Sequence, residues 1–324
     1  MSKGKIFLVG VNGSGTTMLA DALGRHPELY VLPRETRVLP YLAQHYPDSI
    51  LGDLSARRAL AHALGRSKAF WQCNGNHPLL LSDEVLAPLS DFASVVDAMY
   101  NHFAQLEGKQ RWGDKTPMYL QHIGLLARIF PDARFIHIYR DGRDSAQSFH
   151  RRWRQAPSRT IFRWKKAIAL GREQGQRLGS ERYFELSYEE LTADPESWMR
   201  HICAFIGLDF HSEVLNSSMR YMDEIARQAA QGRMVQNSSK WRTYFNSNQV
   251  DELEQIAGKM LADLGYTVRL QGDRDLSSAR LFWLRWKDWM NFSINHITHF
   301  GAKGLIPFFF RVRDALMQNK TNKY

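Results

Sequence analysis

The sequence predicts an α/β fold with a mainly parallel central sheet and helices on both faces. Three short apolar runs indicate strands, at residues 5–11, 135–140 and 182–186. Each run is rich in β-branched or aromatic residues and is followed by a segment with helical periodicity, an alternation typical of parallel sheets. With 324 residues, of which 44% are hydrophobic, the chain is long enough to bury a full core.

The first strand leads through a glycine-rich turn into a helix. Residues 10–17 read Gly-Val-Asn-Gly-Ser-Gly-Thr-Thr, and an apolar helical pattern follows from Met18. Such a turn leaves backbone N–H groups at the positive end of a helix dipole, which predicts a binding site for phosphate or sulfate. A Walker A loop carries its lysine where this chain has Thr16, so the loop lacks the cation that reaches the terminal phosphates of a nucleoside triphosphate.

Two further segments carry candidate catalytic side chains. Residues 34–38 read Arg-Glu-Thr-Arg-Val, and a carboxylate such as Glu35 can take the proton of an attacking hydroxyl. The alternative is that Glu35 pairs with Arg34 or Arg37 on a solvated turn. Residues 111–117 form an extended segment that ends in Lys115-Thr116-Pro117, and a lone lysine in this context is commonly a surface residue.

The segment between these two motifs gives less information. Its periodicity predicts helices over residues 54–64 and 83–106, on either side of a mixed polar and aromatic loop at 71–78. A loop of this kind lines an acceptor pocket in some enzymes and is a plain surface connection in others. Both interpretations of the loop stay open.

A second anion site is predicted after the second strand. That strand ends at Arg140, the chain turns at Asp-Gly, and the following helix places Ser148 and Arg152 on one face by their four-residue spacing. Two anion sites on strands of one sheet suit a nucleotide that is phosphorylated at both ends. The third strand leads to Tyr188, and residues 239–242 read Ser-Lys-Trp-Arg.

Taken together, these motifs resemble those of sulfotransferases that use 3′-phosphoadenosine 5′-phosphosulfate (PAPS), and most of all the tyrosylprotein sulfotransferases. The resemblance covers residues 4–268 and includes Ser-Gly-Thr-Thr, His-Pro-Glu, Glu-Thr-Arg-Val and Asp-Gly-Arg. It implies a three-layer, P-loop-like domain and an enzyme of the EC 2.8.2 type. Such an enzyme moves a sulfuryl group from PAPS to a hydroxyl of a peptide tyrosine, a carbohydrate or a lipid, releases the bisphosphate PAP, and needs no metal.

The resemblance also implies roles for particular residues. Glu35 would act as the base, and Lys115 would steady the transferring sulfuryl group. The cofactor would be held by residues of the loop and of later motifs: Asn12, Gly13, Ser14, Gly15, Thr16, Thr17, Arg140, Ser148, Arg152, Tyr188, Ser239 and Lys240. The chain departs from the pattern at Gly13, where these enzymes carry Arg or Lys, and we expect Lys115, Arg34 or Lys240 to supply that charge.

Three other classes of function remain as alternatives. A catalytically silent module would bind PAP without turnover, a P-loop phosphotransferase would use ATP and Mg²⁺, and a membrane-peripheral interaction protein would need neither. The presence of Glu35, Lys115, Arg140 and Ser148 together favours the sulfotransferase.

We predict two parts, a sulfotransferase domain over residues 1–270 and a basic, aromatic-rich helical extension over 271–324. The chain has a net charge of +10, and from residue 280 onward eight Lys or Arg accompany only two Asp or Glu. Interleaved Trp, Phe and Arg suit a membrane surface, whereas the same rings could pack on the domain or on a second copy in a homodimer. No stretch is apolar enough to span a bilayer.

Composition sets the remaining expectations. The only cysteines, Cys73 and Cys203, give neither a disulfide framework nor the spacing of a metal site. We therefore expect a cytoplasmic protein, with contact to a membrane surface as an open option. The basic charge is assigned to PAPS and to the extension, and no nucleic acid is expected as a partner.

Overall fold

The computed structural model of the chain describes residues 4–216, 234 and 237–300, the last ten of them by backbone path alone. It divides into two compact units, which are described separately. The sheet unit comprises residues 1–141 and 166–238, and the helical unit comprises 142–165 and 239–324. A boundary between domains at residue 270 stays a prediction.

The sheet unit is built on five strands that all run parallel. In chain order they are β1 (Ile6–Gly10), β2 (Leu29–Val31), β3 (Arg111–Lys115), β4 (Arg134–Tyr139) and β5 (Tyr183–Ser187). Their order across the sheet is β2-β3-β1-β4-β5. The predicted α/β class with a mainly parallel sheet is therefore confirmed.

Helices account for most of the rest of the sheet unit. They are α1 (Thr16–Leu23), α2 (Leu39–His45), η1 (Asp48–Ile50), α3 (Leu54–Gly65), α4 (Lys68–Cys73), α5 (Asp83–Leu86), α6 (Phe92–Leu106), η2 (Pro117–His122), α7 (Ile123–Ile129), α10 (Tyr188–Ala193), α11 (Pro195–Ile206) and η3 (Ser212–Leu215). Helix α9 (Pro157–Gln176) contributes its residues from 166 onward to this unit.

The prediction of one helix over residues 83–106 is wrong. The structure has α5 and α6 there, separated by residues 87–91. Pro88 cannot donate a helical hydrogen bond, and Asp91 begins α6 by accepting the Ser94 N–H at 2.7 Å in a capping box. The predicted loop at 71–78 likewise begins inside α4, which ends at Cys73.

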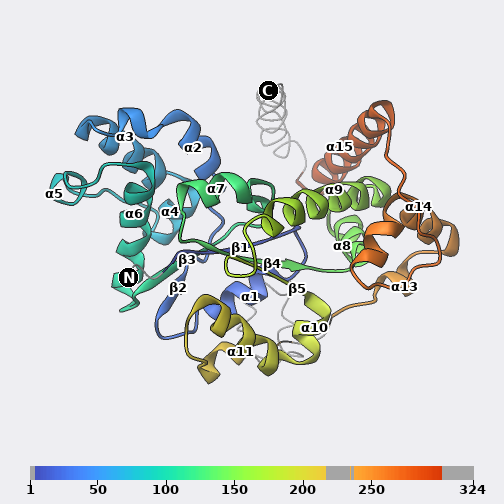
Figure 1. Cartoon of the computed structure of the whole chain (residues 1–324). Coiled ribbons are helices and arrows are strands. Elements are labelled where there is room, and N and C mark those ends of the chain that lie inside the picture. Colours follow the sequence, from blue (N-terminus) through green and yellow to red (C-terminus); the bar gives the residue numbers. More distant parts are fainter. Residues whose placement is uncertain (1–3, 217–233, 235–236, 301–324) are drawn as a thin grey trace. The chain divides into compact units, whose positions relative to one another are not determined.

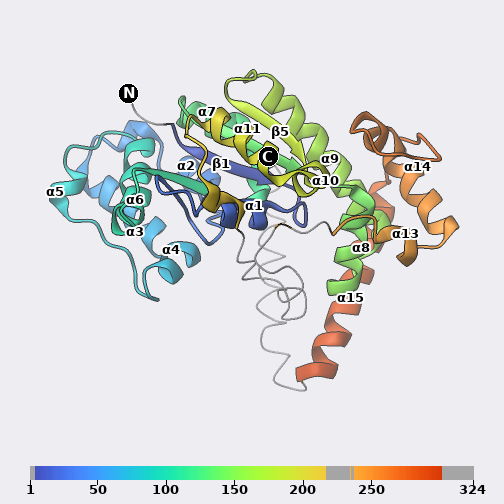
Figure 2. The same cartoon turned by 90° about the horizontal axis from the view of Figure 1, so that it is seen from below.

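Both faces of the sheet are covered, as Figures 1 and 2 show. On one face, Ile6 and Leu8 of β1 join α1, α10 and α11 in a single buried apolar cluster. On the other face Phe7 stacks on Phe135, with ring centroids 5.3 Å apart, and an edge of Trp112 meets Phe7. Burial on both faces explains why the β1 sequence is apolar throughout rather than alternating.

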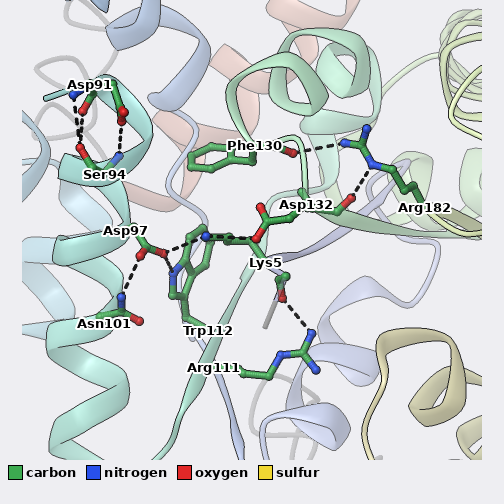
Figure 3. A network of polar contacts seen from close by, with 12 residues as sticks. Lys5, Asp91, Ser94, Asp97, Asn101, Arg111, Trp112, Phe130, Asp132 and Arg182 are labelled. Carbon is green, nitrogen blue, oxygen red and sulfur yellow. Dashed lines mark hydrogen bonds and ion pairs between the residues drawn. The ribbon is translucent and has the colours of Figure 1, made fainter. Parts of the chain in front are cut away.

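The end of the sheet where β1, β3 and β4 begin is fixed by a network of polar contacts (Figure 3). Lys5 Nζ lies 3.3 Å from Asp132 Oδ2 and 3.6 Å from Asp97 Oδ1. The indole N–H of Trp112 donates to Asp97 Oδ1 at 2.7 Å. Arg111 donates to the carbonyl oxygen of Ile206 at 2.7 Å, so charged side chains here satisfy buried polar atoms.

The helical unit contains α8 (Gly142–Trp153), α13 (Trp241–Tyr244), α14 (Ser247–Asp263) and α15 (Ser278–Phe300), together with α9 up to residue 165. A buried ion pair joins α8 to α14, with Arg143 Nη1 2.6 Å from Glu254 Oε1. Asp144 of α8 accepts the backbone N–H groups of Ser239 at 2.7 Å and Trp241 at 3.0 Å. These carboxylates hold the 239–241 segment and α14 on α8.

We predict that Asp97→Ala destabilises the protein while Asp97→Asn largely does not. Alanine leaves the indole N–H of the buried Trp112 without an acceptor, which costs about 1–3 kcal/mol of unfolding free energy. Asparagine retains a side-chain oxygen that can accept the same bond. Urea unfolding of the three proteins measures the difference, and equal losses for both variants would show that the charge of Asp97, rather than its bond to Trp112, is what matters.

Candidate active site

The candidate site lies at the carboxyl edge of the sheet. Ligands of open α/β sheets bind where the strand order reverses, and in this sheet that point is beside β1, which has β3 on one side and β4 on the other. The carboxyl ends of these strands lead to the glycine-rich loop, to Lys115 and to Arg140, and β5 leads to Tyr188. The topology thus gathers residues from four separate sequence motifs.

The loop between β1 and α1 has the form of an anion site. Gly13 and Gly15 have φ angles of +89° and +99°, a conformation that glycine adopts without strain. Among the residues that the structure describes, no side chain caps the start of α1, so the N–H groups of its first turn can bind a ligand. The Ser14 hydroxyl is fully buried and has no hydrogen-bond partner within the described residues. A phosphate or sulfate would satisfy these donors.

Two residues that follow strand ends, Arg140 after β4 and Tyr188 after β5, meet on one side of this loop. A Cβ atom on Gly15 would lie 2.6 Å from Cδ2 of Tyr188, so the aromatic ring packs directly on the loop backbone. The Arg140 guanidinium lies over the same ring, 4.7 Å from its centroid. Arg140 Nη1 also donates to the Gly13 carbonyl oxygen at 3.4 Å, and its other terminal nitrogen donates to the carbonyl oxygen of Asn237.

A second group of residues meets beside the first turn of α1. Lys115 Nζ lies 3.4 Å from the Thr17 hydroxyl and 3.3 Å from Glu35 Oε1. The lysine side chain is only 7% exposed and that of Glu35 is 22% exposed. One buried cation therefore lies between the anion-binding loop and a carboxylate. The sequence-predicted catalytic residues Glu35 and Lys115 are in direct contact.

Glu35 is also paired with Arg37, the alternative that the sequence left open. Arg37 Nε donates to Glu35 Oε2 at 2.8 Å, and Arg37 has a φ angle of +60°, which is strained for a residue other than glycine. The Glu35 carboxylate thus has one oxygen toward Lys115 and the other toward Arg37. Glu35 therefore makes both contacts at once, the one with Lys115 that a catalytic role requires and the one with Arg37 that a pair on a turn requires.

A buried polar network, which the sequence did not reveal, fixes Glu35 relative to Lys115. The Thr36 hydroxyl donates to Asp114 Oδ2 at 2.8 Å, and the Thr36 N–H donates to the Thr116 hydroxyl at 3.1 Å. Tyr100 donates to the same Asp114 oxygen at 2.6 Å, and Tyr119 lies 2.7 Å from the Thr36 hydroxyl. Thr36, which follows Glu35, is thereby hydrogen-bonded to Asp114 and Thr116, which lie directly before and after Lys115.

Burial sets the ionisation of this network. It raises the pKa of Asp114, and hydrogen bonds from Tyr100, Thr116 and Thr36 oppose that rise. Burial and the nearby Asp114 raise the pKa of Tyr100 and of Tyr119 well above the ordinary value, so both phenols keep their protons and can donate. The signal that could have indicated this network is Asp114, an aspartate within a strand whose residues are all buried.

The other predicted cofactor residues are distributed as follows. In the loop, Asn12 is exposed, while Thr16 is buried within the first turn of α1. Four residues belong to the helical unit and are described there: Ser148 and the exposed Arg152 on α8, Ser239 with a φ angle of +61°, and Lys240 just before α13. Their part in binding PAPS stays a prediction.

A cavity of about 300 Å³ lies next to the second group. Thr17, Lys109 and Lys115 form part of its wall, and Leu32 and Pro33 add apolar surface. Within the described residues, no group of His, Cys, Asp or Glu side chains is arranged to hold a metal ion. The absence of a metal from the reaction stays a prediction.

The site combines an anion-binding loop, Arg140 at the end of β4, and the Lys115–Glu35 pair beside the loop. This combination is typical of a protein that acts on a phosphorylated or sulfated nucleotide. Comparison with known proteins specifies the class. The model of the sulfotransferase family matches residues 5–212. The chain therefore belongs to the sulfotransferase family.

Individual relatives agree with this assignment. Protein-tyrosine sulfotransferase 2 of Gallus gallus is 28% identical over 283 residues, which cover 81% of this chain and 69% of the relative. Protein-tyrosine sulfotransferase of Drosophila melanogaster is 27% identical, and the match covers 81% of this chain and 51% of the relative. The solved sulfotransferase domain from the curacin biosynthetic pathway shares the fold, with a TM-score of 0.51, 19% identity, and coverage of 82% of this chain and 98% of that one.

The chain is accordingly a PAPS-dependent sulfotransferase of the EC 2.8.2 type, and that prediction from the sequence is confirmed. PAPS is the sulfuryl donor, and a hydroxyl is the acceptor. The comparisons favour neither the phosphotransferase nor the silent PAP-binding module.

We predict that Gly15→Ala weakens PAP binding by at least about tenfold. The added methyl group would meet the Tyr188 ring at 2.6 Å and would also strain the backbone at a φ angle of +99°, so the loop must shift. Gly52→Ala is the matched control, because a Cβ there meets nothing within 4 Å. Isothermal titration with PAP compares the variants, and unchanged affinity in Gly15→Ala would show that the loop does not bind this ligand.

Proposed function

We propose that the two groups of residues around the loop have separate roles in sulfuryl transfer. PAPS supplies the sulfuryl group when bound. The backbone N–H groups of residue 13 and residues 15–17, together with the Ser14 hydroxyl, hold its 5′ end, while Lys115 and Glu35 act on the reacting oxygens. The Ser14 N–H is already bonded to the Val11 carbonyl oxygen. The observation that carries this proposal is the position of Lys115 Nζ, 3.4 Å from the Thr17 hydroxyl and 3.3 Å from Glu35.

Glu35 acts as the general base in this proposal. An acceptor hydroxyl attacks well only as it loses its proton, and a carboxylate within hydrogen-bond reach can receive it. The contacts with Lys115 and Arg37 fix the positions of both carboxylate oxygens. Displacement of one of these partners by the hydroxyl gives Glu35 the contact that the proton transfer needs.

Lys115 and Arg140 supply positive charge on the two sides of the loop. Lys115 lies beside Thr17, where charge grows on the bridging oxygen of the leaving group. Arg140 reaches the carbonyl oxygen of Gly13 and the ring of Tyr188, which suits a second phosphate, the 3′-phosphate of PAPS. Ser148, Arg152, Ser239 and Lys240 are proposed as further cofactor residues on the sequence resemblance alone.

The acceptor is a hydroxyl whose carrier is a peptide tyrosine, a carbohydrate or a lipid. The named relatives act on protein tyrosine, which supports the first of these. We propose that the cavity beside Thr17 and Lys115 admits the acceptor group. Its volume of about 300 Å³ suits one aromatic side chain or sugar ring and is at the small end of ligand sites.

Incubation with ³⁵S-labelled PAPS and a fractionated extract of the source cells tests the activity and identifies the acceptor. Transfer of label to protein, with acid-stable label recovered on tyrosine after digestion, supports the peptide. Label in a glycan or lipid fraction identifies one of the other carriers. No labelled product in any fraction would contradict turnover and favour the silent PAP-binding module.

A cytoplasmic location is proposed from the cysteines. Cys73 and Cys203 are both free, and burial raises the pKa of each thiol to about 11, which keeps them as unreactive thiols. Free thiols are typical of reducing compartments.

We predict that Glu35→Gln lowers turnover by at least about a hundredfold, the usual scale for removal of a positioned base. PAP affinity should change little, because Lys115 lies between Glu35 and Thr17 of the loop. Glu84→Gln, an exposed carboxylate on α5, is the control. Single-turnover rates and PAP titration separate the two effects, and a Glu35→Gln enzyme that keeps its rate would place the base elsewhere.

We predict that PAP raises the melting temperature more than AMP or ATP at equal concentration. Only PAP carries both a 5′-phosphate for the loop and a 3′-phosphate for Arg140, and binding to the folded state alone stabilises it. Arg140→Ala should reduce the shift with PAP toward that with AMP, whereas Arg128→Ala, an exposed arginine on α7, should not. Equal shifts for PAP and AMP in the unmodified protein would contradict recognition of a 3′-phosphate, and a requirement for Mg²⁺ would favour a phosphotransferase.

A further inference from the structure

Helix α15 of the helical unit presents four large aromatic side chains to solvent. Phe282, Trp283, Trp286 and Trp289 are 73%, 45%, 51% and 41% exposed. At 100° per residue, their spacing places all four on one side of the helix. We call this set the aromatic face. Soluble proteins rarely leave so much contiguous aromatic surface exposed without a partner for it.

The opposite side of α15 is already anchored. Leu284 is buried, with 3% of its surface exposed. Asp288 accepts the Ala156 backbone N–H at 2.7 Å and pairs with Arg159 Nη1 at 2.5 Å. These contacts fix the rotation of the helix about its axis. The aromatic face is consequently directed away from the core of this unit.

Basic side chains flank the aromatic face. Arg280, Arg285 and Lys287 are all exposed, and Arg280 and Lys287 lie over the Trp283 ring, 5.0 Å and 5.3 Å from its centroid. Asp288 is the only acidic residue between 278 and 290, and it is buried in its pair with Arg159. Arg280 Nη2 also lies 3.9 Å from Glu252 Oε1 of α14. The exposed surface of α15 itself, over residues 280–289, carries positive charge and aromatic rings together.

We propose that the aromatic face of α15 binds the headgroup region of an anionic lipid bilayer. Tryptophan rings settle at the depth where headgroups meet acyl chains, and flanking Arg and Lys side chains pair with lipid phosphates and carboxylates. Among the helices that the structure describes, none is long and apolar enough to cross a membrane. The helix would lie along the surface rather than span it.

Charge decides between this partner and a second copy of the chain. Two copies packed through this face would bring two sets of three cations together. Residues 278–290 carry no exposed carboxylate to compensate them, and Glu252 of α14 lies at the edge of the set, 3.9 Å from Arg280. An anionic bilayer carries negative charge, so it attracts these cations and brings no further cations beside them. This inference concerns the helical unit and stands independently of the roles proposed for Glu35 and Lys115.

The test is co-sedimentation of the full chain with lipid vesicles. Binding should be strong to vesicles of phosphatidylcholine with one third phosphatidylserine, weak to phosphatidylcholine alone, and reduced at high salt, because the Debye length shortens. Replacement of the three cations, R280Q/R285Q/K287Q, should lower the partition coefficient by about a hundredfold, at about fivefold for each basic side chain near the surface. F282A/W286A should lower it by at least about tenfold on the same vesicles.

A matched control removes three exposed arginines elsewhere, R177Q/R200Q/R269Q, with the same change in net charge. This control should bind almost as well as the unmodified chain, and L106A controls for an exposed apolar residue on α6. Equal losses in the control and in R280Q/R285Q/K287Q would show that net charge alone attracts the chain, and would overturn the assignment to α15.

Two results with the unmodified chain would also overturn it, whether or not the variants fold. One is the absence of binding to anionic vesicles at low salt. The other is a stable dimer in sedimentation velocity experiments that F282A/W286A converts to a monomer, which would identify the aromatic face as a contact between copies.

Discussion

The candidate site depends on one buried carboxylate that takes no part in the proposed chemistry. Asp114 lies on β3 directly before Lys115, and it accepts hydrogen bonds from Thr36 and Tyr100. Thr36 in turn directly follows Glu35. A strand and an otherwise irregular segment, 78 residues apart in the chain, are thus held in register by a hydrogen bond between the neighbours of the two reactive side chains. Thr116 and Tyr119 contact the same threonine, so a buried network, and not the ion pair alone, holds Lys115 and Glu35 3.3 Å apart.

Topology provides the second constraint. Because β1 has β3 on one side and β4 on the other, the loop that follows β1 lies between Lys115 and Arg140. A long nucleotide with an anionic group at each end suits this arrangement, since each cation serves a different side of the loop. The aromatic ring of Tyr188 fixes the spacing on the Arg140 side, because it packs on Gly15 and carries the guanidinium on its face.

The sequence was sufficient for the parts of this protein that follow from local pattern. Apolar runs and glycine positions predicted the strands, the anion loop and the cation at the end of β4, and the family resemblance led to Glu35 and Lys115. It was not sufficient for features that depend on contacts distant in the chain. Nothing local distinguishes Thr36 or Tyr100 from ordinary surface or core residues. The break between α5 and α6 does not follow from local pattern, because the apolar periodicity on both sides of Pro88 suits one continuous helix.

The conformation of Gly13 restricts which residues the loop can carry at this position. With a φ angle of +89°, the position accepts any other residue only at a cost of about 1–3 kcal/mol in backbone strain. Its carbonyl oxygen is also engaged by Arg140. An arginine or lysine at this position would add a cation to the loop but would have to carry that backbone strain. In place of a cation of its own at this position, the loop has Lys115 beside it, with Nζ 3.4 Å from the Thr17 hydroxyl.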